Sequence, residues 1–211
     1  MYKRRFYFPL ILLLKNFLNK KQMKKIFLIT ILGFMAISTF AQNKIDLTVK
    51  WIAAQNRYEV YAKPNFTNAA FTWGTSQITV VVPASAPDNS LSLTSVNAGG
   101  WSIAASNQIF APPADLNHDF HAAQSSGQAV AFTANTEILL YYFTFSDGQC
   151  RDGVRLFVNG SDPSSSASGM KGGDYSNAID NGLLVDVYNS NYSNSGTSCS
   201  ACNITAPELI K

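Results

Sequence analysis

The run Thr136–Ser146, with the sequence TEILLYYFTFS, limits the possible folds of this chain more than any other segment. In an extended strand, successive side chains point to opposite faces of a sheet. One face of this run would carry Ile138, Leu140, Tyr142 and Thr144, and the other would carry Leu139, Tyr141, Phe143 and Phe145. Because both faces are largely apolar or aromatic, we expect an inner strand that is covered on both sides, as in a β-sandwich.

Other segments have the composition of short strands and are separated by turns that contain Gly, Pro, Asn or Asp. They are 44–52, 57–63, 70–73, 77–82, 91–96, 101–104, 118–122, 129–132, 153–159 and 183–188. The first two should form a hairpin, as should 91–96 with 101–104. The segment 109–115 contains Pro112-Pro113 and should be an edge or a loop. No long segment shows apolar residues at helical spacing, so the sequence predicts an all-β fold, a single antiparallel β-sandwich with almost no helix.

The N-terminal region reads as a secretory signal peptide at 23–41. Met23-Lys-Lys is followed by the apolar run Ile26–Ile37 and by Ser38-Thr-Phe-Ala41, which places small residues before a cleavage site at Gln42. A retained membrane anchor is disfavoured because the run is short for a hydrocarbon core of about 30 Å. A lipoprotein signal is disfavoured because Gln, not Cys, follows the cut. The chain is therefore expected to be secreted or held at the cell surface, with no membrane span in its mature form.

Residues 1–22 precede an already complete signal peptide. We interpret them as an upstream extension of the gene model, with a long signal n-region or a second anchor as the alternative. The β-sandwich domain is assigned to 42–188, and 189–211 to an Asn/Ser-rich tail with a CxxC motif, linker-like from Tyr188 to Ser198. The last residues read like the start of a further segment, which raises the alternative of a truncated reading frame.

The charge of the chain excludes a composition-based case for nucleic-acid binding. The net charge of the whole chain is +3, but all eight basic residues before position 42 lie in the leader. From Gln42 onward, eight Lys or Arg residues stand against thirteen Asp or Glu residues, a net charge of −5. A mildly acidic exported domain has no electrostatic attraction for phosphate backbones.

The three cysteines are Cys150, Cys199 and Cys202. Export favours disulfides, and we expect Cys150 to bridge to one of the two tail cysteines, which leaves the third thiol unpaired or bridged to something outside the chain. A redox role for Cys199-Ser-Ala-Cys202 lacks the strand-to-helix setting of such motifs. A zinc site would lack ligands, because one further Cys and two His residues are all that remain.

Two groups of polar residues resemble parts of catalytic or metal sites. His118 and His121 lie near Asp115 and Asp119, but no nucleophile accompanies them, and we interpret them as surface residues on a strand and its loop. Loops of the C-terminal half carry Asp147, Asp152, Asp162, Asp174 and Asp180. Calcium takes six to eight oxygens from such loops, but their spacing matches no EF-hand, so we predict no cofactor and keep calcium as an open alternative.

The order of the strands resembles the cohesin-like branch of carbohydrate-binding-module-type β-sandwiches from secreted proteins of Bacteroidetes. The resemblance covers about 44–188 and is carried by the opening hairpin, the buried run Gln77–Pro83, and Ile138–Phe145 before Asp147-Gly148. The strand Gly153–Asn159 completes it. The resemblance implies a nine-stranded jelly roll that acts in adhesion, as a scaffold or in glycan binding, within proteins that often use the type IX secretion route.

Aromatic side chains are the expected glycan contacts, because the apolar face of a sugar stacks on a ring. The candidates are Trp73, Trp101, Tyr175, Tyr188 and Tyr192, whereas Trp51 alternates with core residues and should be buried. The favoured hypothesis is a non-catalytic binding or adhesion module, with a polysaccharide or a surface protein as partner. A structural spacer domain of a larger surface protein is the alternative. A hydrolase is disfavoured, because no paired carboxylates or activated nucleophile stand out.

Overall fold

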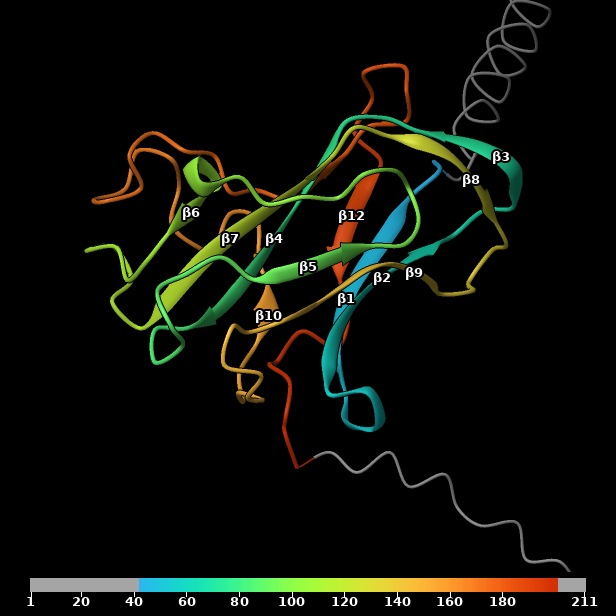
Figure 1. Cartoon of the computed structure of the whole chain (residues 1–211). Helices are drawn as coiled ribbons and strands as arrows, with labels where there is room; N and C mark the ends of the chain where they lie inside the picture. The colour runs from blue at the N-terminus through green and yellow to red at the C-terminus, as the bar shows by residue number, and fades with distance from the viewer. Residues whose placement is uncertain (1–41, 201–211) are drawn as a thin grey trace, which may run out of the picture. The chain divides into compact units, whose positions relative to one another are not determined.

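The computed structural model describes residues 42–200, and these form an all-β structure with several antiparallel sheets (Figure 1). The only helical elements in that range are two short 3₁₀ turns, η1 (Ala53–Gln55) and η2 (Ala105–Asn107). The strands are β1 (Ile45–Ile52), β2 (Arg57–Pro64), β3 (Asn68–Trp73), β4 (Ser76–Pro83), β5 (Ser92–Ser95), β6 (Gln108–Ile109), β7 (His118–Ser125), β8 (Gln128–Phe132), β9 (Ile138–Thr144), β10 (Arg155–Leu156), β11 (Ala178–Ile179) and β12 (Tyr188–Asn191). The predicted signal peptide and Cys202 lie outside the described residues. No helix within 42–200 has the length and apolar character needed to cross a membrane.

The first sheet has the strand order β12-β1-β2-β9-β5. The prediction of an inner strand in Thr136–Ser146 is confirmed, because β9 pairs with β2 on one side and with β5 on the other. The prediction that both of its faces are covered is wrong. Tyr141 and Phe143 are buried, but Tyr142 and Thr144 on the opposite face are partly exposed. A bulge in β9 opposite β2 turns Leu140 into the core as well.

The second sheet has the order β10-β4-β7-β6, with β11 also paired to β4. Its strand β4 is buried on both faces, as the sequence predicts, because each face meets a different apolar cluster. Ile78, Val80 and Val82 belong to the main core, which also contains residues of the first sheet. Val81 on the other face packs in a second cluster with Phe120, Met170 and Tyr175, the last two from the segment between β10 and β11. The two sheets therefore share one core, in agreement with the expected β-sandwich.

Strands β3 and β8 form a separate two-stranded antiparallel ribbon, which Figure 1 shows at the end of the molecule away from β10. Its apolar side contributes Phe71, Trp73 and Phe132 to the main core. Phe71 and Phe132 have ring centroids 5.1 Å apart, and Trp73 meets the edge of Phe132 at 6.1 Å. This aromatic contact fixes the ribbon to the sheets and positions the pocket described below.

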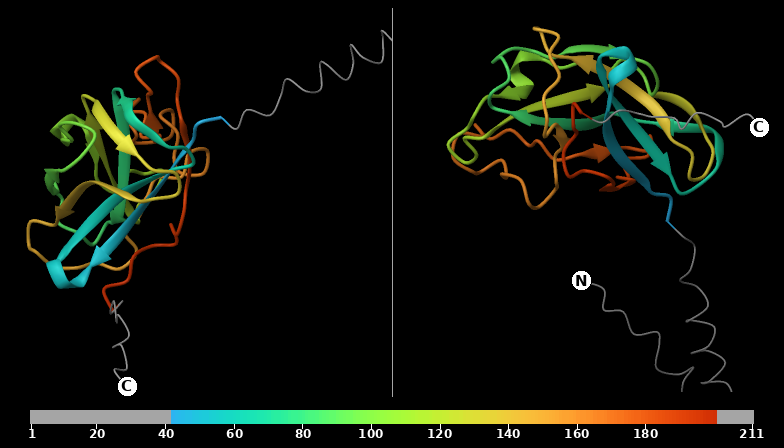
Figure 2. Two further views of the ribbon diagram at one scale, coloured as in Figure 1. Left: turned by 90° about the vertical axis from the view of Figure 1, so that its right-hand side faces the viewer. Right: turned by 90° about the horizontal axis from the view of Figure 1, so that it is seen from below.

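The C-terminal segment corrects the expectation of a linker. β12 adds to the first sheet beside β1, and it does so in parallel, so this sheet is not wholly antiparallel (Figures 1 and 2). The side chain of Asn194 then accepts from the Leu156 amide and donates to the Leu156 carbonyl, at 2.7 and 2.8 Å. Cys199, near the end of the described chain, forms a disulfide with Cys150, with the two Cα atoms 5.7 Å apart. Residues 188–191 are therefore a strand, and the residues that follow are held by the Asn194 bonds and the disulfide.

Two other strand predictions are wrong. The segment 101–104 forms no hairpin with 91–96, because β5 pairs with β9 and Ser102 makes an isolated bridge to Gln124. The segment 183–188 is not a closing strand, and Leu183 and Leu184 are 78% and 94% exposed. The two leucines lie instead in a loop between Asp180 and Asp186.

Candidate functional site

The aromatic residues proposed as ligand platforms are mostly part of the core. Trp73, Trp101 and Tyr175 are 1%, 4% and 3% exposed. Trp101 packs against Tyr141 and donates its indole N–H to the Asn97 carbonyl at 2.8 Å. Tyr188 is half-buried and donates to Asn191. The ring faces of the three core residues are therefore not open to a sugar, and stacking on them is ruled out.

The histidine region is also more buried than expected. His118 is partly exposed and bonds Asp115, but Asp119 and His121 are 0% and 1% exposed. His121 contacts the Gln108 side chain at 2.9 Å, and burial lowers its pKa to about 4. Burial also raises the pKa of Asp119, which accepts the Ala111 amide through one oxygen. Asp119 and His121 are therefore internal, and the surface interpretation was wrong for these two, whereas Asp115 and His118 are partly exposed.

The loop aspartates are held separately. Asp147 pairs with Arg151 and Asp162 with Arg155, while the other three accept backbone amides, Asp152 from Cys199, Asp174 from Ser176 and Asp180 from Gly182. Within residues 42–200, no three His, Cys, Asp or Glu side chains lie close enough together to hold a metal ion.

The outer face of the first sheet carries three half-buried tyrosines with a cation over each ring. Lys50 lies 4.8 Å from the ring centroid of Tyr61, Arg57 lies 3.9 Å from that of Tyr142, and Lys63 lies 3.9 Å from that of Tyr192. We call these six residues the tyrosine face. Of the three rings, Tyr192 alone is among the sequence candidates. Tyr61 was missed, although its alternation with the buried residues of 57–63 places it outward.

Two of the three cations of the tyrosine face are paired with glutamates, and the third, Lys63, lies over the Tyr192 ring. Glu59 accepts from Arg57 and from the Tyr61 hydroxyl, and Glu137 accepts from Lys50 and from the Tyr192 hydroxyl. Burial and the Glu59 hydrogen bond raise the pKa of Tyr61. Burial alone would raise the pKa of Glu137, but the hydrogen bonds from Lys50 and Tyr192 hold it below its usual value. The Glu59 and Glu137 carboxylates thus bond to side chains of the tyrosine face itself.

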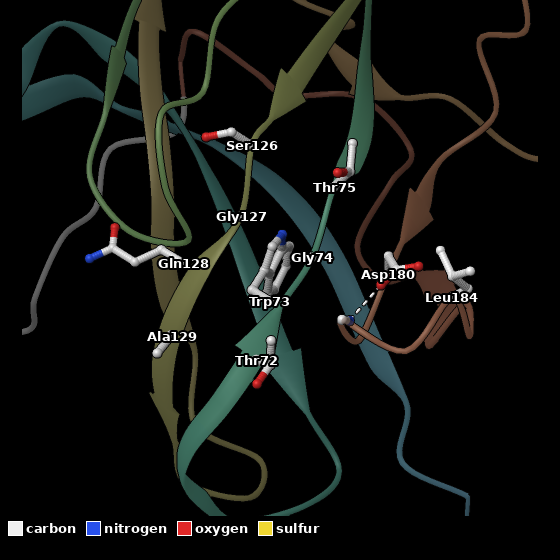
Figure 3. A pocket seen from close by; sticks show the side chains of 11 residues that line it. Thr72, Trp73, Gly74, Thr75, Ser126, Gly127, Gln128, Ala129, Asp180 and Leu184 are labelled. Atoms are coloured by element: carbon white, nitrogen blue, oxygen red, sulfur yellow. Dashed lines mark hydrogen bonds between the residues drawn. The ribbon is translucent and has the colours of Figure 1, made fainter.

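A pocket of about 420 Å³ lies where the β3–β8 ribbon meets the loop that follows β11, and we call it the loop-end pocket (Figure 3). It is lined by Thr72, Trp73, Gly74, Thr75, Ser126, Gly127, Gln128, Ala129, Asp180, Gly182 and Leu184. Three chain segments far apart in sequence contribute to it, which no local motif could have revealed. Of the aromatic residues named from the sequence, Trp73 alone lines this pocket, and its indole is buried.

Glycines allow the three segments to approach one another at this pocket. A Cβ atom on Gly74 would lie 2.4 Å from Asp180 Oδ1, and one on Gly127 would lie 2.4 Å from the Trp73 carbonyl oxygen. A Cβ on Gly182 would lie 2.4 Å from Thr72 Cγ2. Gly127 and Gly182 also have positive φ, of 87° and 78°, which side chains disfavour. The shape of the pocket is therefore fixed by close backbone packing.

The polar side chains of the pocket are not used within the protein. Thr72, Thr75, Ser126 and Gln128 are exposed, and none of their side chains takes part in a hydrogen bond among the described residues. Asp180 binds the Gly182 amide through Oδ1, while Oδ2 has no such bond in the described part of the chain. Side chains with hydroxyl, amide and carboxylate groups thus line one hollow with hydrogen-bonding capacity available.

The loop beside the pocket is held in one conformation by its own polar groups. The Asn181 side chain accepts the Leu183 amide at 2.9 Å, and Asp186 Oδ1 accepts the amides of Ile179 and Tyr188. Leu184 adopts φ of 59°, which is rare for a bulky side chain and costs roughly 1–2 kcal/mol. Such strain persists where surrounding bonds enforce it, and it often accompanies ligand contacts.

Comparisons with protein-family models, with characterised proteins and with solved structures found no match for this chain.

Proposed function

We propose that this chain is an exported, non-catalytic binding module that holds a saccharide in the loop-end pocket. The observation that carries the proposal is the set of unused polar groups there, from Thr75, Ser126, Gln128 and Asp180 Oδ2. Sugars present many hydroxyls that both donate and accept, and sites for them need several such groups around a small apolar contact. Leu184 supplies that contact at the rim, where it is 94% exposed.

The tyrosine face supports this choice by contrast. The neighbouring Glu59 and Glu137 are bonded to its side chains, and its rings are covered by cations. A ligand would have to displace these contacts to bind there. The loop-end pocket requires no such exchange. A lone carboxylate, Asp180, lines it, and glycoside hydrolysis by the usual route needs a pair, which is why we propose binding without catalysis.

Export through a signal peptide at 23–41 and a cohesin-like jelly-roll arrangement remain part of the proposal. The Cys150–Cys199 disulfide supports an oxidising compartment, because such bonds are rare in reducing ones. An all-β domain with a shared core between two sheets is also the architecture that the resemblance implies.

A glycan array probed with the folded chain from Gln42 onward tests the proposal. We expect retention on at least one glycan, and loss of that signal in Asp180→Asn and in Gln128→Ala. Asp174→Asn is the matched control, because Asp174 also accepts the amide two residues further on but does not line this pocket. Loss of binding in the control as well would place the ligand elsewhere.

The alternative is a structural spacer domain of a larger surface protein, and the tyrosine face is the observation that favours it. Side chains that bond to one another across a sheet surface stabilise the strands without any ligand. If the folded chain binds nothing on the array, the spacer function is the one to adopt.

A further inference from the structure

The charges around the loop-end pocket restrict the kind of saccharide that it can hold, if the proposed function is right. Asp180 is the one charged residue among those that line it, and Lys, Arg and His are absent from the lining set. A uronate or sulfated sugar would meet a carboxylate with no cation to pair with it. Because like charges at a binding site are costly, the pocket selects against anionic sugars.

The walls of the pocket restrict the length of the ligand. On one side, the contact of Gly182 with Thr72 closes it off from a second hollow, which Leu183 lines. On the other, Gly127 lies between the Trp73 carbonyl and the backbone of Gly99. A volume of about 420 Å³ is near the lower end of the range of about 300–1,000 Å³ for small-molecule pockets. The hollow thus suits one or two sugar units and not a long chain segment.

Leu184 provides the apolar contact that a buried aromatic ring cannot provide here. The Trp73 ring is 1% exposed, whereas the Leu184 side chain stands at the rim on a loop fixed by Asn181. Its exposure places apolar surface in water, and a bound ring would cover that surface. The left-handed backbone at Leu184 holds it in place before the ligand arrives.

We propose that the loop-end pocket takes the end unit of an uncharged glycan chain. Asp180 Oδ2, Gln128 and the Thr75 hydroxyl bind its hydroxyl groups, and Leu184 covers its apolar face. This inference rests on the proposed function, since it specifies the ligand of the same site.

Calorimetric titration of the folded chain with defined saccharides tests it. The uncharged probes are cellobiose, mannobiose and N,N′-diacetylchitobiose, with the corresponding hexasaccharides, and the anionic probes are digalacturonate and a sulfated heparin disaccharide. We expect at least one uncharged disaccharide to bind, with its hexasaccharide no more than about threefold tighter, because additional units find no further contacts. Neither anionic probe should bind.

Two neighbouring leucines supply a matched pair of variants. Both are exposed, so their replacement should leave the fold intact, but Leu184 lines the loop-end pocket and Leu183 lines the other hollow. Leu184→Ala should weaken binding by about five- to tenfold, as expected for the loss of one apolar contact, and Leu183→Ala should leave it unchanged.

The outcomes distinguish failure of the proposed function from failure of this inference. If none of the saccharides binds, the proposed function fails and this inference fails with it. If only the anionic probes bind, or if affinity rises steeply from disaccharide to hexasaccharide, the chain is a saccharide-binding module but this inference is wrong. Equal effects of Leu183→Ala and Leu184→Ala would also overturn it.

Discussion

The backbone of Gly127 lies directly against the carbonyl oxygen of Trp73, so closely that a Cβ atom at position 127 would be 2.4 Å from it. Gly127 also has φ of 87°, which other residues seldom adopt. Gly127→Ala should therefore lower the free energy of unfolding by about 2 kcal/mol or more, with about 1–2 kcal/mol from the backbone conformation alone. Urea denaturation measures this change.

Gly148→Ala is the control for that prediction. Gly148 also has positive φ, 67°, but nothing lies within 4 Å of an added Cβ atom. Its replacement should lose only the conformational part, about 1–2 kcal/mol. If both variants lose the same stability, the contact between Gly127 and Trp73 has no energetic weight and the pocket is less rigid than its geometry implies.

The sequence was sufficient for the strands whose partners are strongly apolar, and insufficient where the partner is distant. The run Thr136–Ser146 could be placed as an inner strand of a sheet and the segment 77–82 as a buried strand, because so many apolar side chains leave few alternatives. β12 could not be predicted from its Asn and Ser residues. Its strand conformation comes from the free edge of β1, a tertiary contact that overrides local propensity.

The candidate site depends on distant contacts in the same way. Trp73 was named from the sequence, but its role was misjudged, because a single Trp in an aromatic-rich chain gives no indication of which side it faces. Asp180 was named only as a possible calcium ligand. Its place at the same pocket as Thr72 and Trp73 depends on glycines at 74, 127 and 182, whose close approaches are visible only once the chain is folded.

The disulfide should contribute substantially to stability. It joins residues 49 positions apart, and cross-links of this kind typically contribute about 2–4 kcal/mol by restricting the unfolded chain. Cys150→Ser or Cys199→Ser should lower the free energy of unfolding by that amount and expose the β12 segment to proteolysis. Cys202→Ser should change neither, and a large loss in that variant would show that the bridge uses Cys202 instead.

Mild acid should destabilise the protein through His121. Burial lowers its pKa to about 4 in the folded state, whereas an unfolded histidine titrates near 6.5. Between these values the unfolded state binds the extra proton. The contribution of His121 to the free energy of unfolding is therefore fully present above about pH 6.5, and it falls by up to about 3 kcal/mol as the pH drops to about 4. Asp119, whose pKa is raised, acts in the opposite direction at the lower end of this range.

His121→Gln isolates the histidine contribution. The chain has two histidines, so this variant retains His118 alone. Its free energy of unfolding, measured by urea titration at pH 7.5, 6, 5 and 4.5, should vary less with pH than that of the unchanged protein. An equal slope in both proteins would mean that His121 is accessible to protons in the folded state.

Asn177 should be the most sensitive polar residue of the second sheet. It is 1% exposed, its Oδ1 accepts the Thr79 amide at 2.9 Å, and its Nδ2 donates to the Phe157 carbonyl at 2.7 Å. Asn177→Ala leaves the buried Thr79 amide without its partner, at a cost of about 1–3 kcal/mol, whereas the Phe157 carbonyl keeps the Asn191 side chain as a donor at 2.7 Å. Asn177→Asp keeps the acceptor, removes the donor and adds a buried charge, so it should be destabilised as well, and less so at low pH where the carboxyl is protonated.

Thermal unfolding at pH 7 and pH 4 measures both variants. Near-native stability of Asn177→Ala would show that water replaces the side chain and that the segment carrying it is not held to β4 by these bonds.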